Sequence, residues 1–297
     1  MEITLLDGSI GQELVKRSGK PPTTLWSTSV MMETPELVDQ VHDLYFEAGA
    51  TVATTNTYCV LEERLARSGL EEHRHTLWQK AIQSADGARR RNKSGRIAGA
   101  IGPLFASYQP DRCPPALEAA EMYQEIVNAL DPECDVLLIE TMSSIDQARG
   151  ALIATENTIQ PVWIAFSVND YDGTLLRSGE KLKDVQPLID KYNPAAVLVN
   201  CSRPESVTDA VDIIREFGLP FGAYANGFTE ITKEFLSPNP TVAALSERIE
   251  LTPDVYADFA LTWVEQGATI VGGCCEVGPD HIREIYQRLI KQGHRVV

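Results

Sequence analysis

The sequence has no long hydrophobic run, no surplus of basic residues and no dense set of cysteines, and each absence excludes a class of protein. No stretch approaches the roughly 18 apolar residues that a membrane-spanning helix needs. The 26 Lys and Arg are outnumbered by 42 Asp and Glu, and the formal charge of -16 disfavours contact with nucleic-acid phosphates. The opening, MEITLLDGSI, lacks the basic segment and apolar run of a secretory signal. We therefore expect neither a membrane nor a nucleic-acid partner.

Cysteine is too sparse for a secreted disulfide scaffold, with 6 residues in a chain of 297. Two of them, Cys274 and Cys275, are adjacent and cannot easily bridge each other. We expect free thiols in the reduced cytoplasm. With 43% hydrophobic and 23% charged residues, the composition is that of a globular protein with a core. The length permits one α/β barrel or two smaller domains.

Short apolar runs that favour β-structure recur along the chain, and helical patterns separate them. The segment at 34–49 is typical, because Thr34 can cap a helix, Pro35 suits its first position and Gly49 its end. Similar patterns occupy 143–157, 203–218 and 252–267. The expected strands lie at 3–9, 50–58, 96–103, 134–141, 161–168, 194–201, 220–226 and 268–275.

Alternation of strands and helices predicts a parallel sheet of the α/β class, whose strands are apolar throughout because both of their faces are buried. Eight such units make a single-domain (β/α)8 TIM barrel over residues 1–297 the simplest closure. Two connections, 104–117 and 227–252, are longer than a plain unit needs. Both follow strand ends, so we expect them to cover the same mouth of the barrel.

Polar residues gather at the carboxyl ends of the expected strands, where barrel enzymes build their active sites. Asp7 is open to two interpretations, a ligand-binding carboxylate or a helix cap. Glu140 follows four apolar residues, so it needs either a cationic ligand or a structural ion-pair partner. The strand-end set comprises Asp7, Asn56, Glu140, Asn200, Cys201, Asn226, Cys274 and Cys275.

Three cysteines in this set converge although more than seventy positions separate Cys201 from Cys274 and Cys275. Zinc binds thiolates readily, and a catalytic zinc has three protein ligands and an open fourth position. The glycines of VGGCC allow a tight backbone curl that turns adjacent side chains toward one ion. These three residues therefore predict a catalytic Zn²⁺ site. The other cysteines, at 59, 113 and 134, are expected to be ordinary buried residues.

Taken together, these motifs resemble the homocysteine S-methyltransferases over almost the whole chain. The similar segments are LLDGSIGQEL (5–14), LWS (25–27), TTNTY (54–58), GP (102–103), LLIET (137–141), LRSGE (176–180), VNC (199–201) and GGCC (272–275). The spaced VNC and GGCC pair is the most specific.

The resemblance implies the barrel fold, a zinc held by the three cysteines, and a homocysteine sulfur as its fourth ligand. It also implies that Asp7 and Glu140 hold the substrate amino group, and that backbone amides near Gly8 and Ser9 hold its carboxylate. Asn200, Asn226 and Trp26 complete the expected substrate site.

The chain departs from the family pattern at points that affect the pocket. Glu276 follows the paired cysteines where Gly is usual, and Ala225 precedes Asn226 where Pro is common. The opening DGSIGQEL replaces DGG or DGA. The betaine-using branch typically has Tyr after the strand-four Glu, whereas Thr141 stands here. These departures bear on the methyl donor more than on the zinc site.

The expected reaction is methyl transfer to a zinc-bound thiolate, since zinc removes the proton from a thiol of pKa near 8.5. Three cysteine thiolates, a substrate thiolate and Zn²⁺ sum to roughly -2 in formal charge, which attracts a small cationic methyl donor. Folate-using relatives carry extra modules, so a small free donor is expected. The aromatic residues that could face its methyl groups are Trp26, Tyr58, Phe105, Tyr108, Tyr224 and Phe228, and core packing is the alternative for each.

S-methylmethionine or S-adenosylmethionine is the favoured donor, with betaine and dimethylsulfoniopropionate as alternatives. Another thiol or a selenol is an alternative acceptor. A zinc-binding barrel without turnover, acting as a sensor or partner subunit, is the alternative outside enzymes; Asp7 and Glu140 favour the enzyme, because a metal holder needs no amino-acid recognition. The oligomeric state, a homo-oligomer included, stays open.

Overall fold

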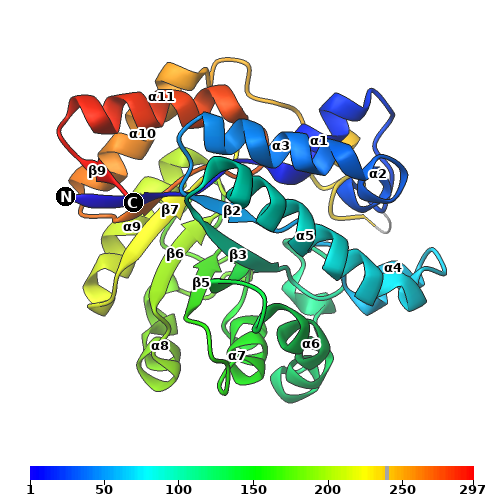
Figure 1. Cartoon of the computed structure of the whole chain (residues 1–297). Coiled ribbons are helices and arrows are strands. Elements are labelled where there is room, and N and C mark those ends of the chain that lie inside the picture. The colour runs from blue at the N-terminus through cyan, green and yellow to red at the C-terminus, as the bar shows by residue number, and fades with distance from the viewer. Residues whose placement is uncertain (238–240) are drawn as a thin grey trace.

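The computed structural model describes residues 1–237 and 241–297. It contains one curled sheet with helices packed outside it (Figure 1). All eight predicted strands form. Their bounds are β1 Glu2–Leu5, β2 Val52–Thr54, β3 Arg96–Ile101, β4 Val136–Met142, β5 Val162–Phe166, β6 Ala196–Asn200, β7 Phe221–Tyr224 and β8 Ile270–Val271. A ninth strand, β9 at Arg295–Val296, was not predicted and pairs with β1.

The sheet is parallel throughout, in the order β2-β3-β4-β5-β6-β7-β8-β1-β9. This confirms the α/β class and a TIM-barrel-like curl. The prediction of a closed eight-stranded barrel needs correction, because β1 and β2 share only an isolated bridge between Leu6 and Val52. The Thr54 amide donates to the Asp7 carboxylate at 2.6 Å. The Asp7 side chain thus accepts from the amide that would otherwise continue the backbone hydrogen bonding between β1 and β2. The pairing of these two strands therefore ends at the Leu6–Val52 bridge, next to the polar residues of the pocket.

Helices alternate with the strands and lie on the outer face of the sheet (Figure 1). They are α1 Ile10–Ser18, α2 Ser27–Glu33, α3 Pro35–Glu47, α4 Glu62–Ala66, α5 Arg74–Asn92, α6 Ala116–Leu130, α7 Ile145–Ala154, α8 Gln186–Tyr192, α9 Pro204–Ile214, α10 Pro253–Glu265 and α11 Pro279–Lys291. None of the helices in the described ranges is both long and apolar enough to cross a membrane.

The predicted punctuation of α3 is largely confirmed. Pro35 occupies its first turn, and Gly49 follows its end with a φ of 106°, a conformation that costs a non-glycine residue. The prediction that the Thr34 side chain caps this helix is wrong, because that side chain makes no capping hydrogen bond. The fixed φ of Pro35 and its lack of an N–H already suit the first turn.

Both faces of the sheet are buried, which explains why the strand sequences are apolar throughout. In β4, Leu137 and Ile139 pack in the large core between sheet and helices, whereas Val136 and Leu138 pack inside the curl. By this alternation Glu140, two residues after Leu138, also faces the inside of the curl. A strand with period-two side chains thus delivers a carboxylate to the carboxyl end of the curled sheet.

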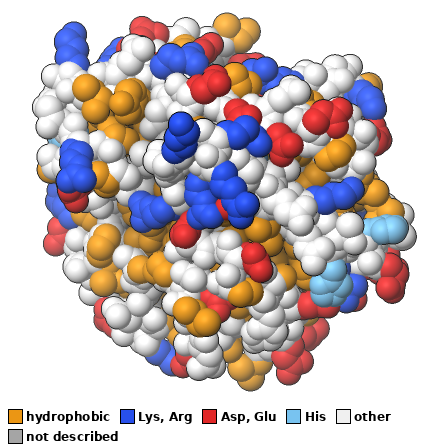
Figure 2. Space-filling view, viewed as in Figure 1, with side chains coloured by type: hydrophobic (Ala, Val, Ile, Leu, Met, Phe, Trp, Pro, Cys, Tyr) orange, Lys and Arg blue, Asp and Glu red, His pale blue; other side chains and the backbone are white. Residues whose placement is uncertain are grey.

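The outer surface shown in Figure 2 carries acidic, basic and hydrophobic side chains interspersed over the helices. The large exposed hydrophobic side chains in the described chain are scattered along the sequence, as Leu117 on α6, Ile159 after α7 and Ile249 in the connection after β7 illustrate. Single exposed apolar residues of this kind are normal on a globular protein. The feature that calls for a functional explanation is the pocket inside the curl.

Candidate metal and substrate site

The pocket is a cavity of about 170 Å³ at the carboxyl end of the strands. Both long connections line it, through residues 105–109 on one side and Phe228, Phe235 and Leu245 on the other, which confirms that they cover one mouth. Residues 238–240 of the second connection lie outside the described residues. The predicted site residues that line the pocket are Asp7, Gly8, Ser9, Trp26, Glu140, Cys201, Cys274 and Cys275, and all six candidate aromatic residues line it too.

Two predicted substrate residues face elsewhere. Asn200 is fully buried, accepts a hydrogen bond from the Thr141 amide at 3.0 Å and donates to the Thr141 hydroxyl at 3.0 Å. It holds the backbone of Thr141, whose φ is 64°. Asn226 is also buried, and its side-chain oxygen accepts from the Phe228 amide at 3.2 Å. Neither side chain lines the pocket.

The three cysteine sulfur atoms lie within 4.8 Å of one another at the floor of the pocket. Cys274 Sγ is 2.7 Å from Cys201 Sγ, and Cys275 Sγ is 3.8 Å from it. Both separations exceed the roughly 2.05 Å of a disulfide, so the thiols are free. Three soft donors in one small volume match the ligand set of a thiolate-bound metal ion.

Unusual backbone geometry brings these sulfur atoms together. Cys201 has a φ of 51°, and its carbonyl accepts from Arg177 at 3.1 Å. A Cβ on Gly272 would lie 2.5 Å from Leu6 Cβ, and one on Gly273 would lie 2.1 Å from Val277. Gly272 therefore lets the β8 end pass close to the end of β1, and Gly273 lets the chain turn back tightly toward Val277, as the tight curl of VGGCC predicts.

Among the three clustered cysteines, Cys201 is the one whose surroundings favour the thiolate. Burial opposes this charge, but hydrogen bonds from Cys274, Cys275 and Tyr108, with nearby Arg177, hold the pKa of the Cys201 thiol well below its ordinary value. Cys274 and Cys275 donate to that thiolate, and this keeps their own pKa values raised. Of the three thiols, that of Cys201 therefore ionises most readily, and a metal ion that binds all three as thiolates displaces their remaining protons.

Two buried carboxyl groups flank the cysteines. Burial raises the pKa of Asp7 to about 7, although Thr54 donates to it from its amide and its hydroxyl, both at 2.6 Å. Burial and the charge of Cys201 raise the pKa of Glu140 to about 8, while Tyr224 donates to it at 3.1 Å. Within the described chain neither carboxyl has a Lys, Arg or His partner. The structural ion pair considered for Glu140 is absent there.

The amino end of α1 also opens into the pocket. The Ser9 hydroxyl accepts from the Gln12 amide at 3.2 Å and caps the helix. The Ser9 amide is already used, because it donates to the Val277 carbonyl at 2.9 Å. The backbone at Gly8 lies so close to the Val277 carbonyl that a Cβ there would be 2.0 Å from its oxygen. A helix start of this kind attracts anions.

Trp26 is anchored by a polar chain that includes the unusual Glu276. The Trp26 indole donates to Gln12 at 2.7 Å, Gln12 donates to Glu276, and Lys16 forms an ion pair with Glu276. Glu276 has a φ of 64°, a conformation that glycine adopts more easily. Its carboxylate compensates by tying the β8 end to α1.

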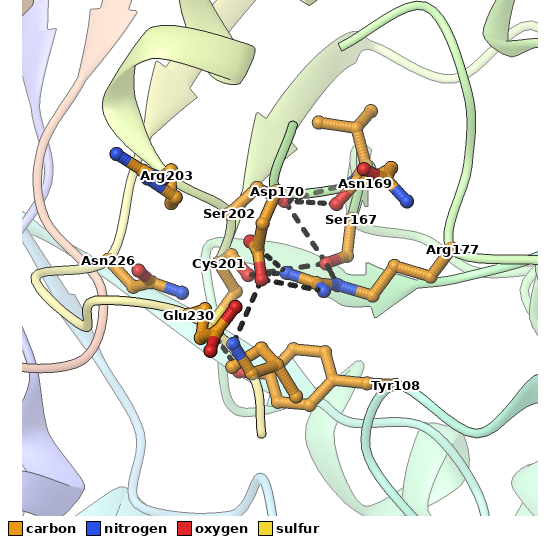
Figure 3. Close-up of polar contacts among 12 residues, drawn as sticks. Tyr108, Ser167, Asn169, Asp170, Arg177, Cys201, Ser202, Arg203, Asn226 and Glu230 are labelled. Atoms are coloured by element: carbon orange, nitrogen blue, oxygen red, sulfur yellow. Dashed lines mark hydrogen bonds and ion pairs between the residues drawn. The ribbon is translucent and has the colours of Figure 1, made fainter. Parts of the chain in front are cut away.

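Arg177, from the LRSGE motif, lies in the loop after β5 and connects that loop to Tyr108 and to the cysteine cluster, a role that was not predicted from the sequence. It pairs with Asp170 at 2.8 Å, and both side chains are less than a tenth exposed. The guanidinium lies 4.6 Å from the Tyr108 ring centroid. In turn the Tyr108 hydroxyl is 3.0 Å from Cys201 Sγ. Figure 3 shows Arg177 reaching between Asp170 and Tyr108 toward Cys201.

Two further arginines at the mouth were missed because their environment depends on the loop at 102–109. Arg64 donates to the Pro103 carbonyl at 2.6 Å and lies 5.6 Å from the Tyr58 ring centroid. Arg67 donates to the Phe105 carbonyl at 2.7 Å. Both line the pocket, and in the described ranges neither forms an ion pair with a carboxylate.

Comparison with known proteins is consistent with this geometry. The family model for homocysteine S-methyltransferase matches residues 4–289. The homocysteine S-methyltransferase YbgG of Bacillus subtilis is 29% identical, over 95% of this chain and 93% of its own length. A selenocysteine methyltransferase of Astragalus bisulcatus is 26% identical, over 96% of this chain and 92% of its own.

Among solved structures, the chain is similar to the metallated form of the Escherichia coli homocysteine methyltransferase MmuM. The TM-score is 0.81 at 26% identity, and the match covers 97% of this chain and 96% of that one. A metallated neighbour and the cluster of three cysteines together indicate a metal-binding site.

Proposed function

The chain belongs to the homocysteine S-methyltransferase family, and we propose that it moves a methyl group from a small sulfonium or ammonium donor to homocysteine at a zinc site. Methionine and the demethylated donor are the products. The observation that carries this proposal is the convergence of three free thiols between two buried carboxyl groups that lack a cationic partner in the described chain. The thiols suit a metal and the carboxyl groups suit an ammonium.

Zn²⁺ is the metal that we propose, with Cys201, Cys274 and Cys275 as its ligands. A set of three thiolates favours zinc over the oxygen-preferring cations, and three protein ligands leave one position for the substrate sulfur. When bound, zinc keeps the thiol of homocysteine deprotonated at neutral pH.

The amino-acid part of homocysteine is proposed to bind across the pocket. Its ammonium lies between Asp7 and Glu140. The positive charge favours the carboxylate form of both groups and so offsets the effect of their burial. Its carboxylate lies at the amino end of α1, where the Gly8 amide is a better donor than the Ser9 amide, which Val277 already occupies. These contacts orient the sulfur toward the metal-binding cysteines. Asn200 and Asn226 support the surrounding backbone.

The donor is proposed to approach from the aromatic side, between Trp26, Tyr58 and Phe105. These rings are suited to the methyl groups of a sulfonium or ammonium cation. Arg64 and Arg67, which lack carboxylate partners in the described chain, add a preference for donors that carry a carboxylate. S-methylmethionine or S-adenosylmethionine is our first choice. Betaine and dimethylsulfoniopropionate also satisfy this chemistry and are the second candidates.

Selenocysteine or another thiol is a second candidate acceptor, favoured by the similarity to the Astragalus bisulcatus enzyme. The same metal position and ammonium site suit sulfur and selenium alike. We also infer that residues 1–297 act as one homocysteine-binding (β/α)8 barrel domain, with the Leu6–Val52 bridge as its seam. Three clustered thiols suit the reducing cytoplasm.

A donor panel with homocysteine tests the proposal. Zinc-loaded protein is incubated with each of the four donors, and mass spectrometry follows methionine and the matching demethylated product. Methionine formation with at least one donor, lost in Cys201→Ala, is the expected result. If no donor yields methionine, the panel is repeated with selenocysteine; failure there too refutes the proposed reaction.

A further inference from the structure

A site that activates one thiolate for methylation must protect the others. In the proposed reaction the donor enters a pocket whose floor carries three cysteine sulfur atoms within 4.8 Å. A methyl group added to any of them would convert a thiolate ligand into a neutral thioether. The thioether loses its charge and binds zinc weakly, so each misdirected transfer would disable the site.

Cys201 differs from the other two cysteines in its surroundings. Its sulfur is 3.0 Å from the Tyr108 hydroxyl, whereas the side-chain hydrogen-bond partners of Cys274 and Cys275 in the described chain are other cysteine sulfur atoms and not a hydroxyl. An O–H donor at this distance draws electron density from a thiolate and occupies one of its lone pairs. Tyr108 also comes from the loop that lines the donor side of the pocket.

The Tyr108 side chain is held in this position from several directions. Arg177 stacks on one side at 4.6 Å and Phe235 packs at 5.9 Å, both measured between the groups' centres. Arg177 is itself fixed by Asp170 at 2.8 Å and by the Ser167 hydroxyl at 2.7 Å (Figure 3). The same guanidinium contacts the Cys201 carbonyl at 3.1 Å. The same guanidinium thus fixes both the Tyr108 ring and the Cys201 backbone.

We propose that Tyr108, held by Arg177, is a positioning residue that protects Cys201 Sγ from methylation and so directs the methyl group to the substrate sulfur. The reaction that it suppresses is a displacement. A lone pair of Cys201 Sγ forms a bond to the donor methyl carbon, and the bond from that carbon to the donor sulfonium breaks. Its electron pair leaves with the donor as a neutral thioether. This inference rests on the proposed methyl transfer.

The test measures methylation of the three metal-binding cysteines and not the turnover of homocysteine. Zinc-loaded wild-type protein and Tyr108→Phe are treated with methyl iodide without homocysteine, and peptide mass spectrometry follows the methyl group on each cysteine. The rates on Cys274 and Cys275 serve as internal references. In Tyr108→Phe we expect the rate on Cys201, relative to them, to rise about tenfold, the factor expected for one lost hydrogen bond to a charged group.

Tyr123→Phe is the matched control, because Tyr123 is also buried, and its hydroxyl donates to the Gly102 carbonyl and accepts from the Leu104 amide, not from any of the three clustered cysteines in the described chain. Its methylation pattern should equal that of the wild type. Arg177→Lys keeps the charge but removes the planar stack, so an intermediate increase at Cys201 is expected. This variant decides the matter if Tyr108→Phe fails to hold zinc.

An unchanged ratio among the three cysteines would overturn the inference, and so would an equal rise at all three, which would indicate general loosening. Methyl iodide needs no donor site. The outcome is therefore independent of the donor panel, and failure of the proposed function is distinguishable from failure of this protection.

Discussion

Replacing Glu140 by Gln should have opposite effects on stability and on substrate binding. Glu140 is 8% exposed, lies two residues before the end of β4 and accepts a hydrogen bond from the Tyr224 hydroxyl at 3.1 Å. Burial raises its pKa from 4.5 to about 8. The folded protein thus retains a proton that the unfolded chain releases near pH 4.5. Between these values each pH unit removes about 1.4 kcal/mol of folding stability.

The magnitude follows from this shift. At pH 8 the ligand-free protein carries a penalty of about 5 kcal/mol from Glu140, an upper figure that relaxation and water entry reduce. Gln has no proton to lose, so Glu140→Gln should be more stable than the wild type at pH 8 and similar at pH 5. By contrast, the variant leaves the homocysteine ammonium without one buried carboxylate. Such losses run to roughly 2 to 5 kcal/mol, a rise in KM of about 30-fold or more.

The assay pairs urea unfolding at pH 5 and pH 8 with steady-state kinetics in homocysteine, and metal analysis accompanies both. Glu276→Gln is the contrast, because Glu276 is equally buried but paired with Lys16, so its loss should lower stability. If Glu140→Gln instead loses zinc or melts below the wild type at pH 8, Glu140 is a structural group and the assigned ammonium site is wrong.

The other predictions concern the metal, the donor and acid stability. The protein should bind about one zinc per chain, and alanine at Cys201, Cys274 or Cys275 should remove it; unchanged zinc content in one variant would exclude that ligand. Arg64→Gln should raise the KM for S-methylmethionine about tenfold but leave that for trimethylsulfonium, which has no carboxylate, unchanged. Equal effects on both donors would show that Arg64 does not contact the donor carboxylate. Burial lowers the pKa of His42 to about 4, so stability should fall by about 3 kcal/mol as pH drops from 6.5 to 4, and urea unfolding of His42→Leu should lack this loss.

Much of the fold follows from local signals. The apolar strands could be predicted because both of their faces are buried, and the two glycines of VGGCC by themselves indicate a tight backbone curl. The short strand β9 could not, since its two residues have no periodicity and depend on pairing with β1. The open seam also escaped prediction. It arises because the Asp7 side chain, not its backbone, accepts from Thr54.

The candidate site was predictable where its chemistry depends on residue type, and less so where it depends on the direction in which a side chain points. The sequence placed Asn200 and Asn226 at strand ends but could not reveal that their side chains would bond to Thr141 and Phe228. Arg177 was visible within LRSGE, yet its contact with Tyr108 joins segments about seventy positions apart. Such contacts arise only when the loops pack together.

If Asp7 binds the substrate ammonium as proposed, its hydrogen bond from the Thr54 amide makes that amide responsive to the bound substrate. The carboxylate that we assign to the substrate ammonium is also the acceptor that holds the Thr54 N–H at the seam between β1 and β2. A cation that ionises Asp7 strengthens this bond, whereas a protonated Asp7 weakens it. Hydrogen exchange at that single amide should therefore slow when homocysteine binds, so the edge of the sheet would record occupancy of the pocket without any turnover.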